Sequence, residues 1–141
     1  RWAGGFGGPK VPHSTVVIPE READYQIKDA YPENAPLLYR LTGDTYPLHA
    51  DPAFAKKAGF DRPIVHGLCS LGYACRMMIG ALFPGEPERM VSIENQFRAV
   101  ALPGDHFTLC VWKTGENEAL FRMVKDSDGK AILDYGRMTW K

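Results

Sequence analysis

One long apolar run, residues 68–83, constrains the fold more than any other part of this 141-residue chain. Its sequence is LCSLGYACRMMIGALF, and apolar residues cover nearly the whole circumference of a helix drawn through it. A helix that is apolar on all sides is typically buried. We therefore expect a central helix here, with the rest of the chain wrapped around it.

Strand-like segments make up most of the chain after this helix. Four runs are separated by the polar stretches PGD, GENE and DSDG, which are typical of tight turns. The runs are RMVSIENQFRAVAL, DHFTLCVWKTG, EALFRMVKDS and KAILDYGRMTW. A further strand is predicted in ADYQIKDAY, residues 23–31. The pattern predicts an α+β fold in which an antiparallel sheet covers one long helix.

Two short helices are predicted between the first strand and the central helix. NAPLLYRLTG has Asn34 as a candidate N-cap and Gly43 at its end. DPAFAKKAG has Asp51 as a candidate cap, Pro52 at the first helical position and Gly59 at its end. The segment between the two helices is therefore held at both sides.

The composition narrows the class of protein. Lys plus Arg and Asp plus Glu number 17 each, so the chain lacks the basic excess of a nucleic-acid binder. No apolar run approaches the roughly 20 residues of a membrane span, and we expect no membrane partner. The three cysteines form no CxxC pair, which favours free thiols in a reducing compartment.

Residues 1–14 are rich in Gly and Pro and are predicted to be linker-like, which leaves 15–141 as a single domain.

An acid and an imidazole stand five residues apart in the segment between the short helices, in GDTYPLH. Pro47 stiffens the backbone between Asp44 and His49. Such a pair is either part of an ordinary capped loop or a proton-transfer pair that shares a water molecule. No spacing of His, Cys and acidic residues suggests a metal site.

Two residues at the start of the central helix and one on the strand after it are further candidates. Gly67 carries one of the N–H groups that a helix N-terminus leaves unpaired, so it either stabilises an oxyanion or merely permits the turn. His66 is expected to be structural. Phe97, on the first strand after the helix, is expected in the core or on the wall of an acyl pocket.

The block LLYRLTGDTYPLHADPAFAKKAGFDRPIVHGLCSLGYACR carries a family resemblance. It resembles the signature of the type-2 enoyl-CoA hydratases, part of the MaoC-like hydratase group, and in particular the active C-terminal half of two-domain members. GGFGGP, VALPGDHFTLCVWKTG and GKAILDYGRM resemble other parts of that pattern, so the likeness spans nearly the whole chain. The resemblance implies a hot-dog fold, in which the antiparallel sheet wraps around one long central helix.

The resemblance also implies an activity: reversible hydration of (2E)-enoyl-CoA to (3R)-3-hydroxyacyl-CoA in fatty-acid metabolism. It requires no cofactor beyond the coenzyme A of the thioester substrate. By position, Asp44 and His49 would activate water and Gly67 would donate its N–H to the thioester oxygen. The implied substrate-contacting residues are Asp44, Thr45, Tyr46, Pro47, Leu48, His49, Gly67 and Phe97.

One position departs from the family pattern, which usually has Asn where this chain has Tyr46. That Asn is thought to help hold the water. Two alternatives therefore stay open: a non-catalytic acyl-CoA-binding half and a thioesterase on the same fold. The expected partner is a second hot-dog unit, as a homodimer or as the other half of a longer chain. The expected location is peroxisomal or cytoplasmic.

Overall fold

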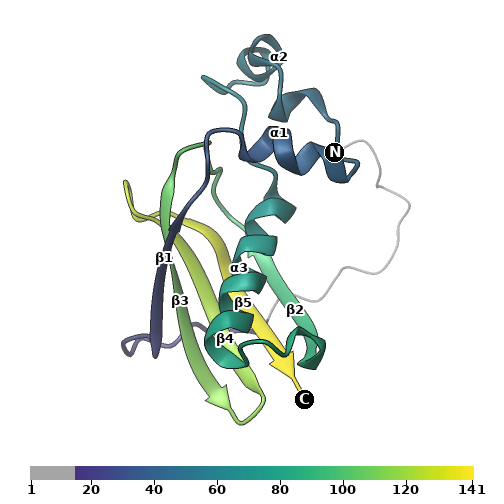
Figure 1. Ribbon diagram of the computed structural model, residues 1–141. Helices are drawn as coiled ribbons and strands as arrows, with labels where there is room; N and C mark the ends of the chain where they lie inside the picture. The colour runs from purple at the N-terminus through teal and green to yellow at the C-terminus, as the bar shows by residue number, and fades with distance from the viewer. Residues whose placement is uncertain (1–14) are drawn as a thin grey trace, which may run out of the picture.

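The computed structural model describes residues 15–141 and consists of one five-stranded sheet with one long helix across a face (Figure 1). The predicted linker-like segment, 1–14, lies outside the described residues. The α-helices and strands are β1 Tyr25–Ala30, α1 Ala35–Tyr39, α2 Pro52–Lys57, α3 Gly67–Leu82, β2 Met90–Phe97, β3 His106–Gly115, β4 Glu118–Lys125 and β5 Ala131–Trp140. Three short 3-10 helices are η1 Arg40–Thr42, η2 Pro47–His49 and η3 Pro87–Arg89.

The sheet has the order β1-β3-β4-β5-β2, and every neighbouring pair is antiparallel. The five predicted strands are all present. The first strand after the helix is shorter than predicted, because β2 ends at Phe97 and the chain then turns toward β3. Strand β2 lies at one edge of the sheet, where it pairs with β5, and β1 lies at the other edge.

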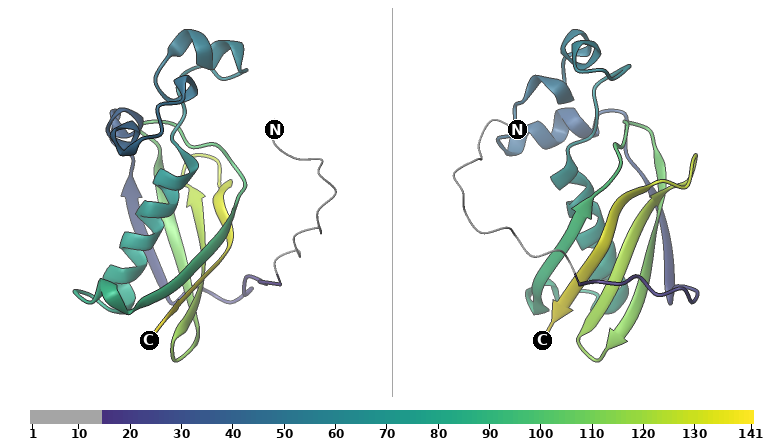
Figure 2. Two further views of the ribbon diagram at one scale, coloured as in Figure 1. Left: turned by 90° about the vertical axis from the view of Figure 1, so that its right-hand side faces the viewer. Right: turned by 180° about the vertical axis from the view of Figure 1, so that it is seen from behind.

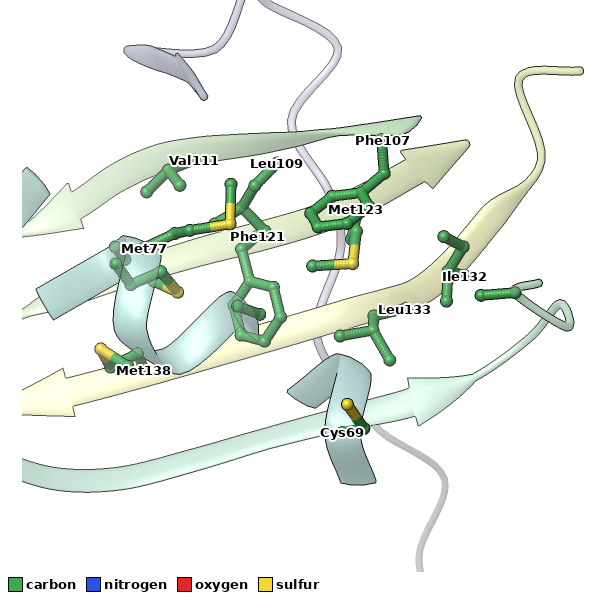
Figure 3. Close-up of a cluster of buried hydrophobic side chains, with 14 of the residues drawn as sticks. Cys69, Met77, Phe107, Leu109, Val111, Phe121, Met123, Ile132, Leu133 and Met138 are labelled. Atoms are coloured by element: carbon green, nitrogen blue, oxygen red, sulfur yellow. The ribbon is translucent and has the colours of Figure 1, made fainter. Parts of the chain in front are cut away.

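The core lies between α3 and the sheet (Figures 2 and 3). Its buried residues include Ala74, Met77 and Met78 of α3 and Phe107, Leu109, Phe121, Leu133 and Met138 of the strands. Within it, Gly136 lies so close to the ring of Phe121 that an added Cβ would stand 2.6 Å from it. The three cysteines are free thiols, as predicted. The antiparallel sheet with one central helix confirms the expected hot-dog fold.

The central helix is buried on one side rather than all round. Leu68, Gly72, Arg76 and Gly80 recur every four residues and are exposed on the side away from the sheet. The sheet is a single layer and covers one face of α3, so the outer face, which carries Leu68 and two glycines beside Arg76, stays open. Within residues 15–141, no helix combines the length and the apolar character needed to cross a membrane.

The two short helices stand beyond the end of the sheet where α3 begins (Figures 1 and 2). Helix α2 starts as predicted, because a carboxylate oxygen of Asp51 accepts hydrogen bonds from the N–H groups of Ala53 and Phe54. Helix α1 is shorter than the predicted segment and passes into η1 before Gly43 ends it at φ 119°. The leucines of that segment face outward, with Leu41 80% exposed. The chain between Gly43 and Asp51 thus lies over the start of α3.

Candidate active site

The acid of the predicted pair lies in a tight turn. An oxygen of the Asp44 carboxylate accepts a hydrogen bond from the Tyr46 N–H at 3.3 Å. The turn leads into η2, in which Pro47 is the first residue and His49 the last. Asp44 is exposed and His49 is half-buried. The proline therefore starts a short helix that carries the imidazole back toward the acid.

A peptide carbonyl fixes the tautomer of His49. Its Nδ1 lies 2.8 Å from the carbonyl oxygen of Ile64. A carbonyl oxygen only accepts, so Nδ1 must carry the proton and donate it. In the neutral ring the other nitrogen, Nε2, then has a bare lone pair. His49 is thus arranged as a proton acceptor.

His66 lies against both members of the pair. Its ring stacks on that of His49 with centroids 3.7 Å apart, and its Nε2–H donates to the main-chain carbonyl of Asp44 at 3.2 Å. The ring of Tyr39 covers its other face at 4.6 Å. His66 is 2% exposed, and burial first, then the nearby His49, lowers its pKa below the ordinary value. A neutral His66 holds the pair without adding charge.

The sequence indicated only a structural role for His66, and the structure places it at the N-cap of α3, in contact with the pair. Its contact with His49 links residues 17 positions apart, which no local spacing reveals. The one sequence signal was its place directly before Gly67.

A shared metal ion does not suit this cluster. Asp44, His49 and His66 each offer one ligand atom, all within 4.8 Å of one another. An imidazole binds a metal through a lone pair in its ring plane, at about 2.0–2.1 Å for zinc. The two rings are stacked with only 21° between their planes, so their lone pairs point side by side and do not converge. The geometry favours proton transfer over metal binding.

Gly67 opens a cavity of about 180 Å³ beside the imidazole. His49, Gly67 and Phe97 all line it. Gly67 is the first residue of α3, so its N–H has no acceptor within the helix. A Cβ on Gly67 would stand 3.1 Å from the ring of Phe97, so the missing side chain keeps the amide accessible. The structure therefore brings three of the predicted site residues to one cavity.

A family model described as MaoC like domain matches residues 14–134. The chain belongs to the MaoC-like domain family. Enoyl-CoA hydratase ChsH3 of Mycobacterium tuberculosis is 40% identical over 133 residues, which are 94% of this chain and 46% of that protein. "Enoyl-CoA hydratase 2, peroxisomal" of Arabidopsis thaliana is 35% identical over 96% of this chain and 47% of its own length.

A solved structure matches the fold of this MaoC-like domain closely. The crystal structure of a MaoC-like dehydratase from Phytophthora capsici aligns with a TM-score of 0.91 at 34% identity. The alignment covers 100% of this chain and 50% of that one. The domain thus spans about half the length of these three relatives.

Tyr46, the departure from the family pattern, lies at the edge of the candidate site. Its ring is 53% exposed, lies 5.4 Å from that of Phe54 in α2 and presents itself edge-on to His49 at 6.4 Å. Of the other predicted contacts, Thr45 and Pro47 are exposed and Leu48 is half-buried. The ring of Tyr46 therefore packs against α2, beside the imidazole of His49.

Proposed function

We propose that this domain catalyses the reversible hydration of (2E)-enoyl-CoA to (3R)-3-hydroxyacyl-CoA. The observation that carries the proposal is the fixed tautomer of His49, whose bare Nε2 stands in the same cluster as the Asp44 carboxylate. Hydratases among the relatives support the substrate class. No cofactor is required beyond the coenzyme A of the substrate.

In this mechanism, Asp44 and His49 hold one water molecule between them. His49 accepts a proton from the water, whose oxygen adds to C3 of the enoyl group. Electron density moves to the thioester oxygen, where the Gly67 N–H stabilises the enolate. The pair then delivers the proton to C2. The water is thus divided as hydroxyl on C3 and hydrogen on C2, and the protein returns to its starting state.

The remaining predicted contacts complete the substrate path. We propose that Thr45, Tyr46, Pro47 and Leu48 border the substrate where it passes the pair. Phe97 lines the cavity at the end of β2 and is 53% exposed. An exposed aromatic side chain at the mouth of an apolar cavity suits contact with an acyl chain.

The test is the loss of enoyl absorbance when the protein is mixed with crotonyl-CoA and decenoyl-CoA. Asp44→Asn and His49→Gln should each lower turnover by at least about a hundredfold, the scale of acid–base groups. His106→Gln is a matched control, because His106 is exposed at the start of β3. Wild-type rates in both site variants would refute the proposal.

The same assay separates the alternatives. A non-catalytic acyl-CoA-binding half would bind enoyl-CoA and leave its absorbance unchanged. A thioesterase would release free coenzyme A from saturated acyl-CoA, which a thiol reagent detects. Chiral analysis of the product tests the (3R) configuration.

We also propose that residues 15–141 form one hot-dog unit that pairs with a second, either another copy or another part of a longer protein. The edge strand β2 pairs with β5 alone among the described strands and exposes Val91. On the outer face of α3, Leu68 is exposed as well. An open edge beside apolar surface favours pairing. Sedimentation velocity of the chain tests for the homodimer.

A peroxisomal or cytoplasmic location is consistent with the peroxisomal relative.

A further inference from the structure

Ser70 is a second polar side chain in the cavity beside the catalytic pair. It lies on α3 one turn after Gly67, is 1% exposed and lines the same cavity as His49. The other side chains on that wall are apolar: Ile64, Val65, Phe97, Ala99, Val100, Ala101 and Ile132. Burying a hydroxyl in such surroundings is costly unless it forms hydrogen bonds.

The hydroxyl of Tyr31 fixes that of Ser70. Tyr31 follows β1, is 1% exposed, and donates its O–H to Ser70 Oγ at 2.8 Å. Its ring is held by Tyr73 and Phe107 at centroid distances of 5.1 and 4.6 Å. Burial raises the pKa of Tyr31 above its ordinary value, so the phenol stays protonated. Tyr31 is therefore a rigid donor to Ser70.

This donation leaves Ser70 with a proton to give. A serine hydroxyl has one proton and two lone pairs, and Tyr31 occupies one of the lone pairs. Helical side chains lean toward the helix N-terminus, so the side chain of Ser70 leans toward the first turn, and Gly67 of that turn lines the same cavity. A hydroxyl that accepts one hydrogen bond is a stronger donor in the next, because chains of hydrogen bonds polarise one another.

We propose that Ser70 donates a hydrogen bond to the thioester oxygen of the substrate beside the Gly67 N–H, and that Tyr31 is the positioning residue that aims it. The proposal rests on the proposed hydratase function, because it assigns a second donor to the same oxyanion. The site then has two donors from one helix turn, one from the main chain and one from a side chain.

A double-mutant cycle of Ser70→Ala, Tyr31→Phe and the double variant tests this role. Ser70→Ala should lower kcat/KM for crotonyl-CoA by about tenfold to a hundredfold, mostly through kcat, since a donor to a developing oxyanion acts on the transition state. Tyr31→Phe should lower it by about threefold to tenfold in the wild-type background and cause no further loss when Ser70 is absent.

Two features protect the test from misfolding. In Ser70→Ala, the single proton of the Tyr31 hydroxyl can turn to Met123 Sδ, 3.5 Å away, as an alternative acceptor. Ser70→Cys keeps the shape of the side chain with a somewhat larger atom and offers only a weak donor, so it should resemble Ser70→Ala in activity while still leaving Tyr31 an acceptor. Ser92→Ala is the matched control, because Ser92 is exposed on β2 and bonds Thr139. It should be unchanged.

The outcomes separate this inference from the hydratase proposal. If the wild type hydrates crotonyl-CoA and Ser70→Ala stays within about twofold of it, the inference fails and the hydratase stands. An equal loss from Tyr31→Phe with and without Ser70 would show a purely structural tyrosine and also overturn it. If the wild type only binds the thioester, the cycle is repeated on the dissociation constant by calorimetry, where Ser70→Ala should weaken binding by about threefold or more. A wild type that neither hydrates nor binds overturns both proposals.

Discussion

Alanine in place of Gly67 would add one methyl group where α3 begins and the cavity opens. That Cβ would stand 3.1 Å from two atoms of the Phe97 ring and 3.6 Å from a third. Phe97 is 53% exposed, so its ring can shift by a few tenths of an ångström at little cost. Alanine is also a better helix former than glycine by up to about 1 kcal/mol. The two effects oppose each other, and we expect the free energy of unfolding to change by less than about 1 kcal/mol.

Activity should respond far more strongly than stability. The methyl group would occupy the space through which a thioester oxygen reaches the Gly67 N–H. Losing one oxyanion donor typically costs about 10²- to 10³-fold in rate, or about 2.7–4 kcal/mol. We therefore expect kcat/KM for crotonyl-CoA to fall by at least about a hundredfold at a nearly constant melting temperature.

Gly72→Ala is the matched control on the same helix. An added Cβ there meets no atom within 4 Å, so activity should not change. Enoyl absorbance gives the rates, and thermal melting gives the stability. If Gly67→Ala keeps its activity to within about threefold, the amide is not an oxyanion donor and the reasoning is wrong. If it loses activity together with its fold, the contact with Phe97 is more rigid than we infer.

Three further results are expected. Tyr46→Asn should keep or raise turnover in the absorbance assay, because it restores the residue that the family pattern has at this position. It should lower the free energy of unfolding in urea by about 0.5–1.5 kcal/mol, because the ring contact with Phe54 is lost. A collapse of turnover would mean that the tyrosine itself takes part in the reaction. Gly136→Ala should destabilise the fold by about 1–3 kcal/mol or more, because the added Cβ would stand 2.6 Å from the buried ring of Phe121. Unchanged unfolding in urea would contradict the close contact between Gly136 and that ring. In the unfolded chain His66 is protonated near its ordinary pKa of 6.5, whereas in the folded chain burial lowers that pKa and protonation needs a lower pH. The free energy of unfolding should therefore fall as the pH drops below about 6.5. Urea unfolding between pH 5 and 7.5 measures that slope, which His66→Asn should reduce; an equal slope in both proteins would assign it to other groups.

Local chemistry made much of the fold predictable. The apolar run predicted α3 to within one residue at each end, and the Asp51-Pro52 pair predicted the start of α2. Turn residues separated the strands correctly. These features depend on contacts within a few residues, which a sequence displays directly.

The parts that were missed depend on contacts between distant segments. The outward leucines of α1 were not foreseen, because helical spacing does not show which face a neighbour will cover. The position of β2 at the sheet edge follows from its pairing with β5, some 40 residues later along the chain. The stack of His66 on His49 and the hydrogen bond from Tyr31 to Ser70 likewise join residues far apart in the sequence.

Both imidazoles of the site take their orientation from peptide carbonyls, that of Ile64 for His49 and that of Asp44 for His66. A peptide carbonyl is present whatever side chain its residue carries. Substitution at position 64 therefore changes the cavity wall but leaves the acceptor that sets the His49 tautomer. Mutations that accumulate over evolution can thus reshape the lining while the path of the main chain preserves the proton acceptor. We expect divergence in this domain to alter which thioester enters the cavity before it alters the base that the thioester meets.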